Sequence, residues 1–294
     1  MSEFLPNILS APRTVLLLAM ALVFARPAVA GALPCNGDPD LCGRAFDTVT
    51  FAGAHNAMSN AADGWFLPNH FAAIPAQLAA GIRVLSLDIH YEQGEVMLCH
   101  SHCSLGRAPL SRVLGQIKGF LDTHPREVVA IEFESYVKAE DAAAVFDAAG
   151  LSSLAYAPPG TDAPWPTLGQ MIDSNKRLVV LSGNAAHGPN WFLDESAFLG
   201  ASPWYHEKIS GFTCGDPAGK PLYLLSHFLY GPHPHPGLAR KANQKKVIVG
   251  RALDCWRQTG RRPNIIMVDF ASVGDVTAAV DTLNHMHAPP PEDG

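Results

Sequence analysis

The chain lacks any dense run of basic residues. Its 21 lysines and arginines are outnumbered by 27 aspartates and glutamates, so the formal net charge is -6. The densest basic segment, residues 241–246, holds three lysines and is typical of a solvated helix face. Because nucleic-acid binding requires a clustered basic patch, we expect no nucleic-acid partner.

The chain also lacks an apolar run long enough to span a membrane. The longest such stretch near the start, the twelve residues from Thr14 to Ala25, follows Arg13 and precedes Ala28-Val29-Ala30, whereas a spanning helix needs about 20 residues. A basic residue, a short apolar stretch and an A-x-A site are typical of a secretory signal peptide. We therefore predict a signal peptide over residues 1–30 and a secreted protein, extracellular or periplasmic.

Cysteine is scarce, and all six cysteines follow the predicted cleavage point. An even number of cysteines in an exported protein favours disulfide bonds. Six cysteines allow 15 pairings. The short loops Cys35–Cys42 and Cys99–Cys103 lose the least chain entropy on closing, which would leave Cys214 to pair with Cys255.

Charged residues make up only 16% of the chain and hydrophobic residues 48%, a balance that indicates a globular protein with a large core. Strand-like runs alternate with helix-like segments such as Leu110–Asp122, whose apolar residues have helical spacing. Such alternation favours a parallel sheet. About eight strands predict an α/β fold, a (β/α)₈-type barrel, as one domain over 31–287 with a disordered tail over 288–294. The expected strands are 48–54, 83–89, 95–99, 128–133, 178–182, 222–226 and 265–270, with a further one near 204–209.

Ionisable side chains stand where several of these apolar runs end, namely His55, Asp88, His100, Glu134 and Asp269. Barrels of this type carry their chemistry at the carboxyl ends of their strands, so we expect these side chains to gather at one mouth. Two imidazoles that titrate near neutral pH can share general base and general acid work. The pattern therefore favours phosphodiester chemistry.

The motifs around these residues form a recognisable set: Gly53-Ala54-His55-Asn56, Gln77-Leu78, Gly81-Ile82-Arg83, Leu87-Asp88, Leu98-Cys99-His100, residues 120–129 and Glu132-Phe133-Glu134. As a set they resemble the phosphatidylinositol-specific phospholipase C X-domain superfamily, in particular its small secreted members. The resemblance runs from about Cys35 to Leu283. It implies a distorted TIM-like barrel and a phosphoric diester hydrolase or lyase that cleaves a phospholipid or glycerophospho head-group diester.

The resemblance also implies roles for the two histidines. In this superfamily the histidine that matches His55 removes the proton from the inositol 2-hydroxyl, and the one that matches His100 protonates the departing diacylglycerol oxygen. Cys99 to Cys103 could alternatively be read as a zinc cluster, but zinc needs four ligands in tetrahedral array, and a disulfide around His100 is the favoured interpretation.

Asp269 ends the last expected strand, which neighbours the first strand in a barrel. It could orient His55 by accepting its other N–H. The alternative is that it caps the following helix.

Asn56, Asp88 and Glu134 match three positions of the calcium site in the metal-dependent branch of the superfamily, and oxygen ligands of this kind suit Ca²⁺ or Mg²⁺. The family acid two residues before Asp88 is Ser86 in this chain. The arginine that replaces the calcium charge in the metal-independent branch is His90 in this chain. The sequence matches neither branch fully, so a metal cofactor is a candidate. Glu132, deeper on the same strand face as Glu134, is interpreted as an interior support.

Three further residues are candidates for contact with the substrate or its phosphate: Arg83, His90 and His227. For Arg83 a place in the barrel wall or in an ion pair is the favoured interpretation, and for His227 a structural role is the alternative. Trp65, Phe66, Trp191 and Trp204 fall in or near expected mouth loops. They could form a lipid-facing rim, although ordinary loop packing is the favoured interpretation.

Two competing functions remain. A metal-dependent glycerophosphodiesterase or sphingomyelinase D-like enzyme would also use two histidines, but Ser86-Leu87-Asp88 lacks the Glu-x-Asp that such enzymes carry. A non-catalytic lipid- or glycan-binding barrel would not need both His55 and His100. We expect a phosphodiester substrate such as a phospholipid, transient contact with a membrane surface and a monomeric protein.

Overall fold

The structure is a computed structural model that describes Met1 and residues 33–291. The predicted signal peptide over residues 1–30 lies outside the described residues, as do the last three residues of the predicted tail, 292–294. Residues 288–291 of that tail form no helix or strand. Among the described residues, no helix has the length and apolar character needed to cross a membrane.

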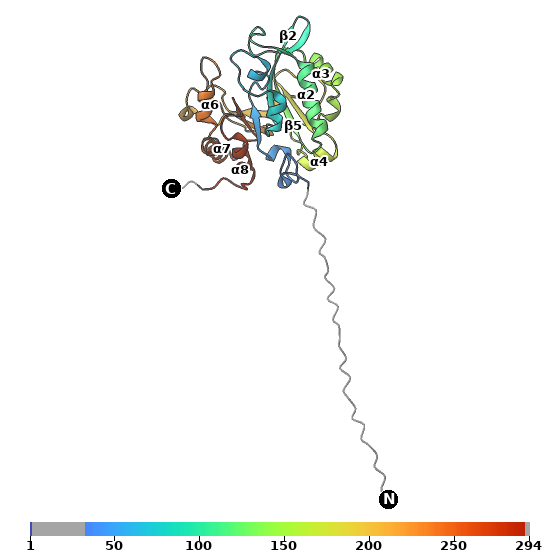
Figure 1. Cartoon of the computed structure of the whole chain (residues 1–294), viewed down its shortest axis with the longest axis vertical. Coiled ribbons are helices and arrows are strands. Elements are labelled where there is room, and N and C mark those ends of the chain that lie inside the picture. Colours follow the sequence, from blue (N-terminus) through green and yellow to red (C-terminus); the bar gives the residue numbers. More distant parts are fainter. Residues whose placement is uncertain (2–32, 292–294) are drawn as a thin grey trace. The chain divides into compact units, whose positions relative to one another are not determined.

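A curled sheet organises residues 33–291 (Figure 1). Eight strands pair in the order β7-β6-β5-β2-β1-β10-β9-β8, and each pair along this path is parallel. The end strands β7 and β8 are not paired with each other, so the barrel is open there. The strands are β1 (Phe51–Ala54), β2 (Val84–Glu92), β5 (Val129–Ser135), β6 (Leu178–Ser182), β7 (Phe192–Asp194), β8 (Leu199–Ala201), β9 (Leu222–Ser226) and β10 (Ile265–Val268). The predicted α/β fold of TIM-like type is confirmed.

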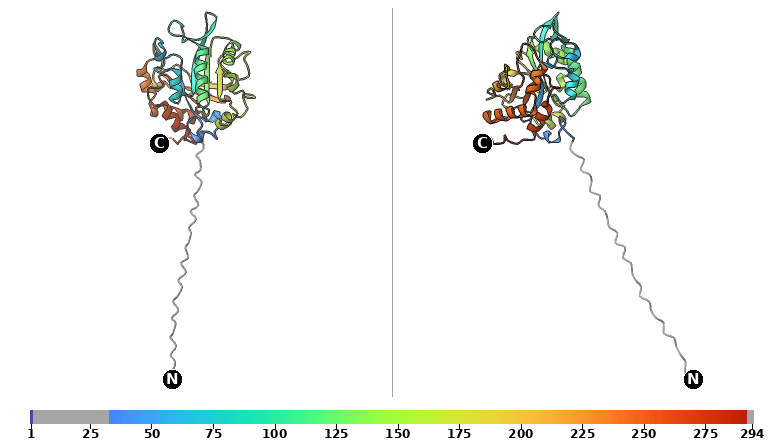
Figure 2. Two further views of the ribbon diagram at one scale, coloured as in Figure 1. Left: turned by 45° about the vertical axis from the view of Figure 1, so that its right-hand side comes forward. Right: turned by 60° about the vertical axis from the view of Figure 1, so that its left-hand side comes forward.

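Helices cover the outer face of this sheet (Figures 1 and 2). Helices α1, α2 and α3 pack in succession, and α8 packs against α7, β1 and β10. The expected amphipathic helix over 110–122 is α2. The helices are α1 (Ile74–Ala79), α2 (Leu110–Thr123), α3 (Ala139–Ala148), α4 (Leu168–Asp173), α5 (Glu195–Phe198), α6 (Pro236–Ala242), α7 (Lys245–Thr259) and α8 (Val276–Asn284).

The inner face of the sheet changes from apolar to polar toward the carboxyl ends of the strands. Successive side chains of a strand point to opposite faces. On β2, Leu85 and Leu87 pack in the cluster shared with the helices, while Val84 packs in the inner cluster. Ser86 and Asp88 continue the inner face beyond Val84. The apolar floor of the barrel is therefore followed by polar side chains at its mouth.

Two predicted strands differ from the observed ones. The segment expected as a barrel strand over 95–99 is β3 (Glu95–Leu98), which runs antiparallel to β2 and pairs with β4 (Ala108–Pro109). The reason is the two-residue turn Gln93-Gly94, whose φ values of 53° and 84° suit a tight hairpin. The β2–β3 hairpin projects beyond the sheet in Figure 1. No strand forms over 204–209; β7 and β8 lie before it.

The three expected disulfides are confirmed: Cys35–Cys42, Cys99–Cys103 and Cys214–Cys255. No cysteine of the described chain is free. The Cys99–Cys103 bond closes the loop that carries His100, which rules out the zinc alternative because both thiolates are consumed.

Candidate active site

Strands β1 and β10 place His55 beside Asp269. The strands are parallel with Ala54 opposite Val268, so the residues that follow leave the sheet together. Nδ1 of His55 lies 2.9 Å from Oδ1 of Asp269, and it must be the donor because a carboxylate only accepts. The predicted contact is therefore present. The alternative in which Asp269 caps the next helix is wrong, since α8 begins at Val276 after Asp275.

Two neighbours fix the geometry of this pair. Asn69 Nδ2 donates to the same Asp269 oxygen over 2.9 Å. The ring of Phe228 stacks on the His55 imidazole with centroids 4.0 Å apart and planes 3° apart. With Nδ1 engaged and one ring face covered, His55 presents Nε2 to the mouth of the barrel.

The second histidine converges on the same point. Nε2 of His55 lies 3.2 Å from one terminal amide atom of Asn56, and Nε2 of His100 lies 3.3 Å from that same atom. Two imidazole nitrogens thus face one small volume from different elements, β1 and the loop after β3. This arrangement can take a proton at one nitrogen and deliver one at the other.

The pKa values of the two histidines are shifted in opposite directions. Burial alone would lower the pKa of His55, but the charge of Asp269 and its hydrogen bond, with Asp88 and Glu132 beyond, outweigh burial and raise it. Burial, followed by the charge of His55, lowers the pKa of His100. The pKa of Asp269 is lowered overall despite its burial, because His55 and Asn69 stabilise the carboxylate.

Four carboxylates interact with one another at this end of the sheet, those of Asp88, Glu132, Glu134 and Glu195. Asp88 and Glu134 are opposite each other on β2 and β5, and Ser86 is opposite Glu132 on the same strands. Burial, then the charge of Glu134, raises the pKa of Asp88 to about 8. Burial, then the charge of Glu132, raises the pKa of Glu195 to about 7. Within residues 33–291 no lysine or arginine forms an ion pair with any of the four.

The amide of Asn56 lies between Asp88 and the two imidazoles. With its nitrogen toward Asp88, the amide donates to the two carboxylate oxygens at 2.7 and 3.2 Å, and its oxygen faces Nε2 of His55 and Nε2 of His100 at 3.2 and 3.3 Å. Asn56, Asp88 and Glu134 carry oxygen donors of the type that calcium prefers, and Glu134, which is exposed and accepts from Tyr136, stands at the rim.

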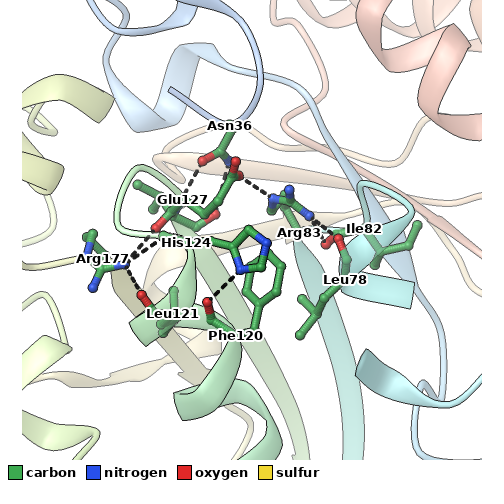
Figure 3. Close-up of polar contacts among 10 residues, drawn as sticks. Asn36, Leu78, Ile82, Arg83, Phe120, Leu121, His124, Glu127 and Arg177 are labelled. Atoms are coloured by element: carbon green, nitrogen blue, oxygen red, sulfur yellow. Dashed lines mark hydrogen bonds and ion pairs between the residues drawn. The ribbon is translucent and has the colours of Figure 1, made fainter. Parts of the chain in front are cut away.

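Arg83 is a correction to the predicted phosphate contacts. It precedes β2, at the amino end of the strand, so a strand length separates it from the mouth. Its Nε donates to Glu127 over 2.7 Å, and Nη1 donates to the carbonyls of Leu78 and Ile82 (Figure 3). The ion-pair alternative for Arg83 is the one observed.

His227 is a second correction. It follows β9 at the carboxyl end, as expected, but it is fully buried. Nε2 contacts the carbonyl of Ala242 at 3.0 Å, and Nδ1 faces Nη1 of Arg251 at 3.3 Å. Burial, then the charge of Arg251, lowers the pKa of His227 to about 3. His227 is therefore a neutral structural residue, because the segment through α6 covers it.

His90 does lie near the mouth. It shares the inner face of β2 with Asp88, stacks on Tyr136 with ring centroids 4.4 Å apart, and its buried Nε2 has no hydrogen-bond partner among the described residues. Substrate contact by His90 stays a prediction.

Sequence reasoning missed several residues of the site. Asn69, Phe228 and Glu195 come from loops or from a one-turn helix, and no motif marks them. Glu132 lies one layer deeper than Glu134, opposite Ser86, as predicted, and its charge is one of those that raise the pKa of His55.

Comparison with solved structures shows which known proteins share this fold. Phosphatidylinositol-specific phospholipase C from Listeria monocytogenes aligns with a TM-score of 0.60 at 16% identity, covering 87% of this chain and 97% of that one. The phosphatidylinositol-specific phospholipase C of S. aureus aligns with a TM-score of 0.59 at 13% identity, covering 83% and 95%. The fold is thus a TIM-like barrel of the phosphatidylinositol-specific phospholipase C type.

Sequence comparison identifies the family. The PI-PLC X 1 family model matches residues 41–284, and the chain belongs to this family. A PI-PLC X domain-containing protein 1 of Arthroderma benhamiae is 32% identical, over 92% of this chain and 95% of its own length. An uncharacterized secreted protein of the same fungus is 28% identical over 84% of this chain, which spans 62% of that protein. A PI-PLC X domain-containing protein of Arabidopsis thaliana is 27% identical over 84% of this chain.

Proposed function

We propose that this protein is an exported phosphodiesterase of the phospholipase C type, acting on a phospholipid or glycerophospho head-group diester. The observation that carries the proposal is the convergence of the His55 and His100 Nε2 atoms on one point, with Asp269 behind His55. The signal-like N-terminus, three disulfides and a relative named as secreted support export.

In the proposed reaction, Nε2 of His55 takes the proton of a substrate hydroxyl next to the phosphate as that oxygen attacks phosphorus. Nε2–H of His100 gives its proton to the departing alkoxide as the P–O bond breaks. Asp269 holds the His55 tautomer and stabilises the imidazolium that forms. The product of this first step is a cyclic phosphodiester, and no water is consumed in it.

Asn56, Asp88 and Glu134 would hold a divalent cation beside these histidines. When bound, such an ion would offset the negative charge that builds on the phosphate oxygens. Residue 90 is a histidine, so no arginine at that position can offset the charge of the phosphate oxygens. Arg83 lies at the other end of β2, where it donates to Glu127. Position 86 on β2 is a serine, whereas the metal-dependent branch of the superfamily has an acid there. Water would therefore fill more of the six to eight oxygen positions that calcium prefers.

The proposal predicts chelator-sensitive release of a cyclic phosphate. The purified mature chain is incubated with phosphatidylinositol and with other phosphodiesters, with and without a calcium chelator, and early products are followed by phosphorus NMR. A cyclic phosphate should appear first, and the chelator should lower the rate by at least about tenfold if the ion carries several kcal/mol of charge stabilisation.

Other outcomes separate the competing functions. An acyclic monoester from the first turnover would mean direct attack by water, as in the glycerophosphodiesterase alternative. Saturable binding of lipid without cleavage of any diester would mean the non-catalytic barrel. Full activity in excess chelator would be compatible with catalysis by the two histidines, but it would show that no cation takes part in the reaction.

An exposed aromatic cluster (Trp204, Tyr205 and Tyr230) supports contact with a membrane surface. The three side chains are 60%, 48% and 46% exposed and pack on one another with ring centroids 4.5 to 5.8 Å apart. They follow β8 and β9, at the carboxyl ends where the site lies. Aromatic side chains with a polar atom favour the lipid–water boundary. By contrast Trp65 is buried and Trp191 packs against the core, so the packing interpretation applies to them.

The double substitution Trp204→Ala with Tyr230→Ala should weaken binding to phospholipid vesicles by at least about tenfold, because each aromatic side chain removed from water contributes on the order of 1.5 kcal/mol or more. Sedimentation with sucrose-loaded vesicles measures this. Activity on a short-chain diester below its micelle concentration serves as the control and should stay within about threefold of wild type, since neither residue contacts His55 or His100. Unchanged vesicle binding would contradict the membrane role of the cluster.

A further inference from the structure

The two histidines of the candidate site are held in different ways. His55 has a carboxylate at Nδ1 and an aromatic ring stacked on one face. His100 has neither support: among residues 33–291 the ion pairs of histidines involve only His55 and His285, and no aromatic ring stacks on His100. Within the same residues, the one polar contact of its ring is that of Nε2 with Asn56. The orientation of His100 therefore depends on the backbone that carries it.

The loop that carries His100, residues 99–107, joins the paired strands β3 and β4. Its two ends are tied to neighbouring segments: the Cys99 N–H donates to a β2 carbonyl over 3.2 Å, and the Leu105 carbonyl accepts a hydrogen bond of 2.8 Å from the loop after β1. Between these ends, the backbone hydrogen bonds of residues 100–104 stay within the loop. Among the described residues, the disulfide that closes the loop is therefore the cross-link that fixes this turn.

The backbone of this turn has a conformation that must be held. Ser101, next to His100, has a φ of 60°, in the left-handed region that residues other than glycine adopt uncommonly. Such a conformation persists where the surrounding structure fixes it. The disulfide brings the Cα atoms of Cys99 and Cys103 to 4.8 Å, and Cys99 is fully buried. The bond thus ties the exposed residues 101 and 102 to the core, with one cysteine on each side of His100.

We propose that the Cys99–Cys103 disulfide positions His100 for proton transfer to the leaving oxygen. It would do for the acid what Asp269 does for the base. This inference rests on the proposed function for the role of His100, but the order of the turn can be tested without any substrate. Because a displacement of about 1 Å can cost about 10²-fold in rate, loss of the disulfide should remove the acid step and leave the base in place.

Cleavage of two diesters that differ only in their leaving group tests the proposal. The bond is removed from the mature chain with Cys99→Ala and Cys103→Ser, so that no free thiol remains on this loop. One diester has an alkyl leaving group and the other a nitrophenyl group. Only the alkyl group needs a proton from an acid, because nitrophenolate is a weak base and departs without one. The variant should lose about 10²-fold or more in kcat/KM with the alkyl diester and no more than about threefold with the nitrophenyl diester.

Removal of a second disulfide is the matched control. Cys35–Cys42 also closes a short loop, also joins a fully buried cysteine to a partly buried one, and lies near the amino end of β5, away from the mouth. Cys35→Ala with Cys42→Ser should lower the melting temperature but leave the ratio of the two rates unchanged. His100→Ala gives the reference pattern for loss of the acid. Adding it to the variant without the loop disulfide should cost less than about threefold more, because both changes remove the same step.

The order of the turn is measured separately, by backbone NMR order parameters of residues 100–102. A rigid backbone gives about 0.85 and a flexible one less than about 0.6. The wild type and the control variant should show the rigid value. The variant without the Cys99–Cys103 bond should show the flexible value in this turn and the rigid value in the strands, which also establishes that it is folded.

The outcomes separate this inference from the proposed function. Equal losses with the two diesters, or an unchanged rate with the alkyl diester, would overturn the positioning role even though diester cleavage itself is established. If the wild type cleaves no diester, the proposed function fails and the order parameters decide alone. A turn that stays rigid without its disulfide would then contradict the inference, and a flexible turn would support the hold of the disulfide on His100.

Discussion

Replacement of His55 or His100 by alanine is expected to lower kcat/KM by about 10²- to 10⁴-fold, the usual contribution of a positioned acid or base. The two Nε2 atoms face one volume, so each substitution removes one of the two proton transfers of the proposed reaction. The measurement is the initial rate of diester cleavage over a range of substrate concentrations.

His102→Ala is the matched control for this experiment. His102 is exposed, lies on the same disulfide-closed loop and is two residues from His100. Its loss should change kcat/KM by no more than about threefold, as for a surface substitution away from the site. Near-native activity in either His55→Ala or His100→Ala would show that the base–acid assignment is wrong.

Replacement of Asp269 by asparagine is expected to lower kcat/KM by about 10²-fold at neutral pH, because the amide can hold Nδ1 of His55 in the wrong tautomer and cannot stabilise an imidazolium. Asp269 acts through His55 and is a positioning residue, so the rate alone does not identify its role. The pH dependence of kcat/KM does.

The sign of the pH effect follows from the two pKa shifts. The reaction needs His55 neutral and His100 protonated, yet the pKa of His55 is raised and that of His100 lowered. The acid limb of the profile is then set by His100 and the basic limb by His55, with only a small fraction of enzyme in the reactive form between them. Because the charge and hydrogen bond of Asp269 raise the pKa of His55, Asp269→Asn should move the basic limb to lower pH. It should move the acid limb less, since Asp269 raises the pKa of His100 by its charge alone.

Asp275→Asn provides the control, since Asp275 is an exposed acid six residues further on that makes no side-chain cap to α8. It should leave both the rate and the limbs of the profile unchanged. A drop in rate for Asp269→Asn with an unmoved basic limb would indicate that Asp269 only supports the fold.

Local sequence determined a large part of this protein. The alternation of strands and helices, the spacing of α2 and the placement of His55, Asp88 and Asp269 after apolar runs predicted the barrel and its mouth, because period and turn chemistry are local properties. The three disulfides followed from short separations and elimination. The hairpin at Gln93-Gly94 was missed, although its turn type is encoded in two residues.

Only the tertiary structure decided which polar residues meet. His55 and Asp269 are far apart in the chain and join because β1 pairs with β10. Arg83, at the amino end of β2, forms an ion pair with Glu127, a partner that no local pattern marks. His227 ends its strand at the mouth, yet α6 and Arg251 bury it. The register between β2 and β5 places Asp88 opposite Glu134 and Ser86 opposite Glu132. Register, depth and burial depend on packing between distant segments, and a single sequence carries no direct record of them.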